Sequence, residues 1–207
     1  MEKRALKGKI GFFGGTFDPI HYGHIHMALQ LMERAHLDTV LFCPTSLSPF
    51  KQDAFPLVSA KLRLEMVRLA IAPIEKFAAL DLEVGLKVPA FTIDTMRRLV
   101  TSVKKEGDAA QFFLLLSQDA LPRLHEWKEV DDLLVLAHPL IASRTAESVT
   151  TKNLSQSASA AVSKGIIQTP ILDISSTEIR NRLAASLYCG HLVPQDVLDY
   201  IRGNELY

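Results

Sequence analysis

Short apolar runs alternate along the chain with stretches in which apolar residues recur every three or four positions. The runs favour buried strands, because parallel strands covered on both faces are apolar at nearly every position. We expect strands over residues 9–13, 39–43, 77–84 and 111–116, a further strand within 133–143, and a late one over 166–174.

The stretches between these runs show the periodicity of helices with one buried face. Predicted helices cover residues 25–35, the segment from Ser59 to Pro73, residues 93–103, a short region near 119–124, and the segments after Ser175 and after Pro194. Residues 145–165 are rich in Ser, Ala and Thr with little periodicity, so we expect a surface loop or a weak helix there.

Strands that alternate with helices indicate a parallel sheet with helices on both faces. Right-handed crossovers then give a doubly wound, mostly parallel α/β fold of the Rossmann-like kind. We expect residues 1–207 to form a single domain, because the length suffices for one substantial core and no internal repeat or linker divides the chain. Ligands of such folds bind beyond the carboxyl ends of the strands.

Composition and charge narrow the class of protein. Apolar residues make up 48% and charged residues 22%, which is ordinary for a globular protein, and the formal net charge is zero. A neutral chain is disfavoured as a general binder of nucleic acid or membrane surfaces. Two cysteines give no disulfide framework, and the most apolar stretch, residues 133–142, is too short to cross a bilayer. We expect a cytoplasmic protein, and assembly into a homo-oligomer is left open.

The stretch FGGTFDPIHYGH directly follows the first predicted strand. Gly14 and Gly15 carry no side chain where the backbone leaves that strand, so a ligand can approach the main chain there. The Asp18-Pro19 pair predicts a turn that leads into the next helix. Two glycines can also serve a tight turn alone, but their place between a strand and a helix favours a ligand site.

Phosphate is the ligand that this stretch favours. Backbone N–H groups at a helix start, together with the positive end of the helix dipole, attract anions. His21 and His24 lie three residues apart near that start and can donate hydrogen bonds, and Thr16 can add a hydroxyl. Zinc is the alternative because His26 is near, but no neighbouring Cys, Asp or Glu completes a ligand set. We therefore predict no metal centre held by protein ligands.

A second candidate region is ISSTEIR, near the C-terminus. Ser176 and Thr177 present hydroxyls and N–H groups at a predicted helix start, which suits phosphate. Arg180 follows one turn later and adds a permanent positive charge.

Together these two stretches resemble the signature motifs of the nucleotidyltransferase superfamily with a T/H-x-G-H element. GGTFDPIHYGH resembles the first motif and ISSTEIR the second. The likeness extends to the bacterial nicotinate-nucleotide adenylyltransferases and covers nearly the whole chain except residues 145–165. It includes PTSLSPFK at 44–51, PAFTIDTMRRL at 89–99, SQDALPRLHEW at 117–127 and the final LVPQDVLDYIRGNELY.

The resemblance implies a Rossmann-like nucleotidyltransferase fold and an enzyme of NAD biosynthesis. Members of this family join the AMP part of ATP to nicotinate mononucleotide and release deamido-NAD and pyrophosphate, with Mg²⁺. ATP and nicotinate mononucleotide are thus the expected partners. Magnesium prefers substrate phosphates and water as ligands, so a carboxylate cluster is not required.

The resemblance also assigns site residues by position. His21, His24 and Arg180 take the catalytic roles. ATP and its phosphates would be bound by Gly14, Gly15, Thr16, Lys51, Ser176 and Thr177, and the pyridine nucleotide by Thr92, Asp119 and Trp127, with the Trp127 ring stacked on the pyridine ring.

Three positions depart from the family pattern: Phe50 stands where His is frequent, Phe91 where Tyr is frequent, and Ser117 where Gly is usual. These departures leave the choice of pyridine nucleotide open. The alternatives are the same transfer to nicotinamide mononucleotide or to phosphopantetheine, and a nucleotide-binding sensor without turnover. Chain length and Trp127 disfavour phosphopantetheine.

Overall fold

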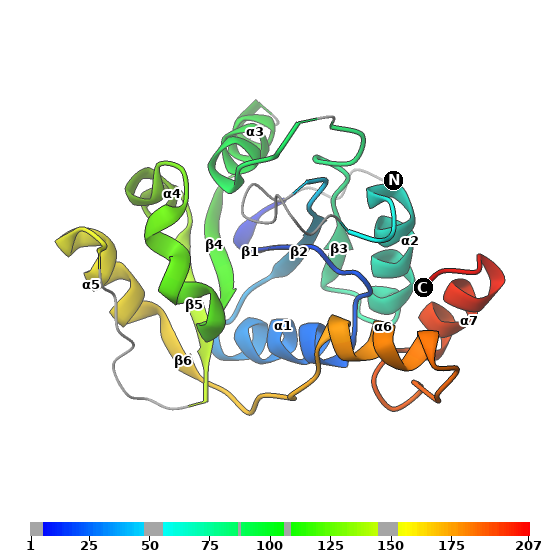
Figure 1. The fold of residues 1–207 in the computed structure, drawn as a ribbon. Coiled ribbons are helices and arrows are strands. Elements are labelled where there is room, and N and C mark those ends of the chain that lie inside the picture. Colours follow the sequence, from blue (N-terminus) through cyan, green and yellow to red (C-terminus); the bar gives the residue numbers. More distant parts are fainter. Residues whose placement is uncertain (1–5, 48–55, 87, 106–108, 145–152) are drawn as a thin grey trace. The chain divides into compact units, whose positions relative to one another are not determined.

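The computed structural model describes residues 6–47, 56–86, 88–105, 109–144 and 153–207 (Figure 1). Six strands of this described chain form one sheet in the order β3-β2-β1-β4-β5-β6. Their bounds are β1 (Gly8–Gly15), β2 (Thr39–Pro44), β3 (Phe77–Ala79), β4 (Ala110–Ser117), β5 (His138–Ser143) and β6 (Ile166–Gln168). The pairs β1–β4, β4–β5 and β5–β6 are parallel. This strand order confirms the predicted doubly wound α/β fold.

Except for α4, which the periodicity does not predict, the helices lie close to where the periodicity places them. They are α1 (Tyr22–Ala35), α2 (Ala60–Ile71), α3 (Thr92–Lys105), the 3₁₀ helix η1 (Gln118–Glu126), α4 (Val130–Leu136), α5 (Gln156–Gly165), α6 (Ser176–Ala184) and α7 (Gln195–Gly203). Ser59 caps α2, because its hydroxyl accepts a hydrogen bond from the backbone N–H of Leu62. Ser175 caps α6 in the same way through the N–H of Glu178. No described helix is long and apolar enough to cross a membrane.

Two predicted strands, over 77–84 and 166–174, are shorter than expected, and the strand expected within 133–143 is confirmed. The run 77–84 is strand only to Ala79, because the chain then turns, with the Val84 N–H bonded to the Asp81 carbonyl. Within 133–143 the first residues form α4, whose buried face carries Leu133 and Leu134, and the strand begins at His138.

The late strand ends at Gln168 for a different reason. The Thr169 N–H still bonds the Ser143 carbonyl, but Pro170 has no N–H to continue the ladder. For residues 145–165 we expect a surface loop or a weak helix, and a helix forms at Gln156–Gly165. Residues 145–152 lie outside the described residues.

The chain divides into two compact units, each made of three separate segments. Unit 1 comprises residues 1–13, 28–41 and 91–170, and unit 2 comprises residues 14–27, 42–90 and 171–207. Both predicted phosphate motifs belong to unit 2. The expectation of a single domain stays a prediction.

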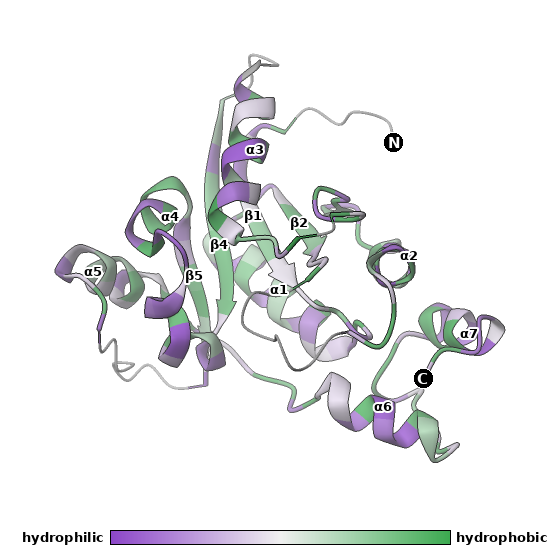
Figure 2. Cartoon of the chain, turned by 45° about the horizontal axis from the view of Figure 1, so that its top comes forward, coloured by the Kyte–Doolittle hydropathy of each residue, from purple (hydrophilic) through white to green (hydrophobic). Residues whose placement is uncertain are grey.

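The core of unit 1 lies on β4 and β5, whose residues are largely hydrophobic (Figure 2). In α3 the apolar residues Ile93, Met96 and Leu99 are buried while Arg97 and Arg98 are exposed, as the periodicity predicts. Helices α4 and α5 pack beside β5 (Figure 1).

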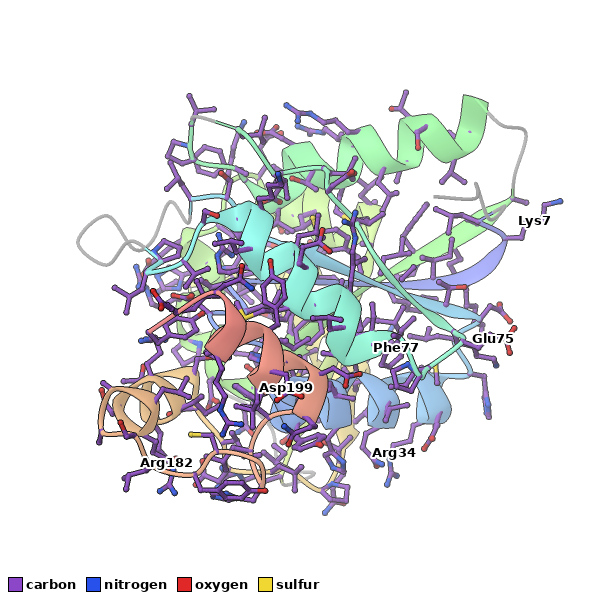
Figure 3. The ribbon with its side chains drawn as sticks, turned by 90° about the vertical axis from the view of Figure 1, so that its right-hand side faces the viewer. Lys7, Arg34, Glu75, Phe77, Arg182 and Asp199 are labelled. Carbon is purple, nitrogen blue, oxygen red and sulfur yellow. The ribbon has the colours of Figure 1, made fainter. Side chains whose placement is uncertain are left out.

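Unit 2 is organised around α2, which packs against α7 (Figures 1 and 3). Phe77 lies beside the lower end of α2 in Figure 3, and its ring centroid is 5.0 Å from that of Phe42. The ring of Phe17 lies 5.8 Å from Phe42 on the same cluster. This apolar cluster therefore anchors the chain just beyond β1, where the first phosphate motif begins.

Candidate active site

Residues 14–24 form the predicted arrangement of strand end, turn and helix start. Strand β1 ends at Gly15, Asp18 and Pro19 form a turn with a cis peptide bond between them, and α1 begins at Tyr22. The Tyr22 N–H bonds the carbonyl of Leu192, which ties this helix start to the chain before α7.

Gly15 makes room for the ring of Phe17. Phe17 has a φ of 49°, a left-handed conformation that is uncommon for a bulky residue, and its buried ring folds back over the glycine. A Cβ at position 15 would lie 2.8 Å from that ring, so any side chain there would displace it. The backbone access that we expect Gly14 and Gly15 to give a ligand stays a prediction.

The two histidine rings of the motif stack on each other. The ring centroids of His21 and His24 lie 3.7 Å apart at an interplanar angle of 26°, and the Phe17 ring meets His24 edge-on at 5.1 Å. The backbone N–H of His21 donates a hydrogen bond to His24 Nδ1 over 3.3 Å. Because Nδ1 accepts, the neutral His24 ring carries its proton on Nε2 and can donate from there.

Both rings are neutral at neutral pH. Burial lowers the pKa of His21 to about 4. Burial, and then repulsion from a protonated His21, lower the pKa of His24 well below its usual value. The pair therefore offers neutral hydrogen-bond donors to an anion, and positive charge has to come from other groups.

Gly23, between the two histidines, favours this packing, which the sequence did not indicate. A Cβ at position 23 would lie 3.0 Å from His21 Nδ1 and 3.4 Å from the Leu172 carbonyl oxygen. Within the described chain, the buried Nδ1 of His21 has no hydrogen-bond partner. The glycine thus leaves room for the His21 ring beside the first turn of α1.

The second motif meets the first in this structure. The Ser176 hydroxyl donates to the Pro19 carbonyl over 2.9 Å, across 157 residues of sequence. Arg180 Nη1 donates to the Asp18 carbonyl over 2.7 Å, and its Nη2 donates to Thr177 Oγ1 over 3.1 Å. The start of α6 therefore lies against the turn between β1 and α1, and the structure brings Ser176, Thr177 and Arg180 to the turn that directly precedes His21 and His24 in unit 2. Thr16 lies earlier in the same turn region, where its carbonyl accepts from Arg63.

Arg63 is a buried cation beneath this region. Its side chain is 0% exposed, and it donates to the carbonyls of Thr16, Thr45 (2.6 Å), Ser46 (3.3 Å) and Val58 (2.9 Å). Burial lowers its pKa, and the nearby Asp18 carboxylate partly offsets that effect. Arg63 thus fixes three loop segments of unit 2 to one another.

The face of α2 that is buried differs in part from the one that the periodicity predicts, which carries Leu62, Met66, Leu69 and Ala70. Met66 and Ala70 are buried, whereas Leu62 and Leu69 are half-buried and Arg63 and Leu64 are buried instead. The reason is that carbonyls of the surrounding loops solvate the Arg63 guanidinium. The pattern of apolar residues gives no sign of these carbonyls.

Asp18 is the acidic residue of the turn, and it is only 5% exposed. One carboxylate oxygen accepts from the backbone N–H of Leu57 (2.9 Å) and the other from the hydroxyl of Tyr207 (2.5 Å). Among the described residues no group of three or more His, Cys, Asp or Glu side chains could hold a metal ion.

The candidate residues for the pyridine nucleotide belong to unit 1. Thr92 is the first residue of α3, Asp119 is exposed in η1, and the half-buried Trp127 directly follows η1. Exposed ion pairs bind the segment after Trp127 to α3: Lys128 pairs with Asp94 at 2.9 Å and Arg97 with Glu129 at 2.6 Å. The segments that carry Thr92 and Trp127 are therefore linked.

Of the positions that depart from the family pattern, two are described. The ammonium of Lys128 lies 5.1 Å from the ring centroid of Phe91, a cation–π contact. Ser117 ends β4 and makes no side-chain capping bond to η1. Lys51 and Phe50 lie outside the described residues.

Comparisons with known proteins match nearly the whole chain. The cytidylyltransferase-like family matches residues 12–182. A probable nicotinate-nucleotide adenylyltransferase of Methylacidiphilum infernorum is 35% identical over 210 residues, covering 100% of this chain and 96% of the relative. That of Synechococcus sp. (strain JA-3-3Ab) is 36% identical, covering 96% and 94%.

Solved structures agree with the fold. The nicotinic acid mononucleotide adenylyltransferase of Plasmodium falciparum complexed with NaAD is similar with a TM-score of 0.71 and 21% identity, covering 97% of each chain. The same enzyme complexed with APC is similar with a TM-score of 0.68 and 20% identity, covering 96% of each chain.

Proposed function

Because the chain belongs to the cytidylyltransferase-like family and, within it, to the nicotinate-nucleotide adenylyltransferases, we propose that it transfers AMP from ATP to nicotinate mononucleotide. The products are deamido-NAD and pyrophosphate, and the reaction is a step of NAD biosynthesis. Cys43 and Cys189 are both free thiols, which fits a reducing cytoplasm as the place of the reaction.

The observation that carries this proposal is the contact between the two phosphate motifs. Ser176 bonds Pro19 and Arg180 bonds Asp18, so the start of α6 lies against the turn before α1, and we assign both to one phosphate site. Helix starts and arginine are the groups that hold phosphate in proteins. Adenylyl transfer needs such a site, since both substrates react through phosphate.

In the proposed reaction a 5′-phosphate oxygen of nicotinate mononucleotide attacks the α-phosphorus of ATP. A new P–O bond forms, the bond from the α-phosphorus to the bridging oxygen breaks, and pyrophosphate leaves with its electron pair. The attacking phosphate is largely ionised at neutral pH, so no general base is required. Catalysis then consists of holding the phosphates in line and stabilising the charge that develops.

The site residues divide this work according to their protonation. His24, neutral and protonated on Nε2, donates a hydrogen bond to a phosphate oxygen, and His21 lies stacked beside it. Arg180 supplies positive charge. Further contacts to ATP and its phosphates are assigned to Gly14, Gly15, Thr16, Lys51, Ser176 and Thr177.

Magnesium is assigned to the substrates rather than to a protein cage. Both oxygens of the Asp18 carboxylate already accept hydrogen bonds, so we do not assign this carboxylate to the metal. The turn also offers hydrogen-bond donors, which suit phosphate. Bound with ATP, Mg²⁺ would neutralise phosphate charge while phosphate oxygens and water supply its ligands.

The pyridine nucleotide is assigned to Thr92, Asp119 and Trp127. Trp127 is half-buried, and an aromatic ring of this size suits stacking on a pyridine ring. The ion pairs of Lys128 and Arg97 hold its segment beside α3, whose first residue is Thr92.

The test is pyrophosphate release by the purified protein with ATP and Mg²⁺, with nicotinate mononucleotide, nicotinamide mononucleotide or phosphopantetheine as the acceptor. A strong preference for nicotinate mononucleotide supports the proposal. Preference for another acceptor would retain the phosphate site and refute the pyridine assignment. ATP binding without release with any acceptor would indicate a nucleotide sensor.

A further inference from the structure

The last residue of the sequence reaches the first phosphate motif. The Tyr207 hydroxyl donates a 2.5 Å hydrogen bond to Asp18, from which it is separated by 189 residues. Its ring is half-buried. Burial, and then the hydrogen bond to Asp18, raise the pKa of Tyr207, so the hydroxyl keeps its proton and remains a donor.

Helix α7 delivers this tyrosine to the turn. Its residues Val197, Leu198 and Ile201 are buried, and it packs against α2 (Figures 1 and 3). After the helix ends, the Leu206 N–H bonds the Ile201 carbonyl over 3.0 Å, which folds the last residues back. The C-terminus lies beside α6 and α7 in Figures 1 and 2.

Asp18 joins this end of the chain to the second phosphate motif. Its carboxylate accepts from Tyr207 and from the Leu57 N–H, while its backbone carbonyl accepts from Arg180. A shift of Asp18 would therefore move the acceptor of Arg180. It would also move His21, which lies three residues after Asp18 in the sequence.

We propose that Tyr207 is a positioning residue for the phosphate site. Its hydroxyl holds the Asp18 carboxylate, and thereby sets the turn from which His21, His24 and Arg180 meet the phosphates of ATP. This inference rests on the proposed function, because the effect on turnover presupposes adenylyl transfer. The alternative is that Tyr207 only anchors α7, in which case its hydroxyl has no specific effect on the reaction.

The experiment compares Tyr207→Phe, which removes only the hydroxyl, with the control Tyr200→Phe in α7. We expect Tyr207→Phe to lower kcat about tenfold, a loss typical of one hydrogen bond to a charged group, with the KM for the pyridine nucleotide changed by less than about twofold. Tyr200→Phe should keep both constants within about twofold. An unchanged kcat in folded Tyr207→Phe would overturn the proposal.

A double-mutant cycle with Asp18→Asn tests the route. If the hydroxyl acts through the carboxylate, adding Tyr207→Phe to Asp18→Asn costs little further activity, so the two effects are not additive. Additive effects would overturn this route. Urea unfolding of each variant identifies losses that come from unfolded protein, and a kcat loss that matches the unfolded fraction would assign Tyr207 to anchoring alone.

The failure of the proposed function can be told apart from the failure of this inference. Wild-type protein that releases no pyrophosphate with any acceptor refutes the function. The positioning role is then judged by the affinity for ATP, which Tyr207→Phe should weaken several-fold and Tyr200→Phe should not. Equal ATP affinities of the two variants would refute it.

Discussion

The turn over residues 14–24 and the segment around Trp127 are held by different kinds of contact. Beneath the turn, Arg63 and Asp18 are buried and bond backbone groups of several loops. Beside Trp127, the pairs Lys128–Asp94 and Arg97–Glu129 connect side chains that are 39–46% exposed. Water and salt screen the second kind of contact but hardly reach the first.

This difference predicts how each region responds to substitution. A buried charge that loses its partners leaves polar groups without hydrogen bonds, which is costly, whereas an exposed ion pair is replaced by water at little cost. We therefore expect the turn over residues 14–24 to be fixed in advance, and the segment of Trp127 to tolerate change.

The largest expected effect is that of Arg63→Ala. The variant leaves the carbonyls of Thr16, Thr45 and Val58 without their donor, and we expect it to lower the free energy of unfolding by about 3–5 kcal/mol. Urea unfolding measures the change. The matched control is Arg68→Ala in the same helix, where the partner Glu65 is partly exposed. Equal losses in the two variants would contradict the role assigned to Arg63.

Next in size is the loss of the His24 donor. We expect His24→Ala to lower kcat by about a hundred- to a thousandfold, as is typical for one donor to a developing phosphate charge. Steady-state pyrophosphate release gives kcat. His26→Ala, two residues along the same helix, is the control and should keep turnover within about threefold. A folded His24→Ala variant with near-full turnover would refute the catalytic assignment.

The buried pair also makes stability depend on pH. The pKa of His21 is about 4 in the folded protein and about 6.5 in the unfolded chain, so between these values the unfolded state binds the extra proton. Stability is full above about pH 6.5 and falls by about 3 kcal/mol as the pH drops to about 4. Burial lowers the pKa of His24 too, which acts in the same direction.

Urea unfolding at several pH values between 7 and 4.5 measures this slope. The matched variant is His21→Gln, which cannot take up the proton, so its stability should fall less steeply than that of the wild type over the same range. Parallel slopes in the two proteins would show that His21 is not the group responsible.

The sequence predicts those parts of the site that depend on near neighbours. The strand, the Asp18-Pro19 turn and the helix start follow one another along the chain, so apolar pattern and turn residues suffice to predict them. The contacts of Arg63 and Tyr207 could not be predicted in this way, since they bridge up to 47 and 189 residues. Periodicity records which positions are apolar, whereas these two are polar groups buried by distant partners. Helix α2 also carries Lys61, Glu65 and Arg68, so a charged residue between its apolar positions does not single out Arg63.

The smallest expected effect lies in the segment of Trp127. Arg97→Gln removes the exposed pairs with Glu129 (2.6 Å) and Asp132 (3.2 Å). Because water replaces such contacts readily, we expect the KM for the pyridine nucleotide to rise by no more than about threefold, with kcat unchanged. High salt screens the same pairs, so the difference between wild type and variant should shrink as salt is added. The neighbouring Arg98→Gln is the control. A large rise in KM that does not depend on salt would mean that Arg97 contacts the substrate itself. The proposed contrast between the Trp127 segment and the turn over residues 14–24 would then be wrong.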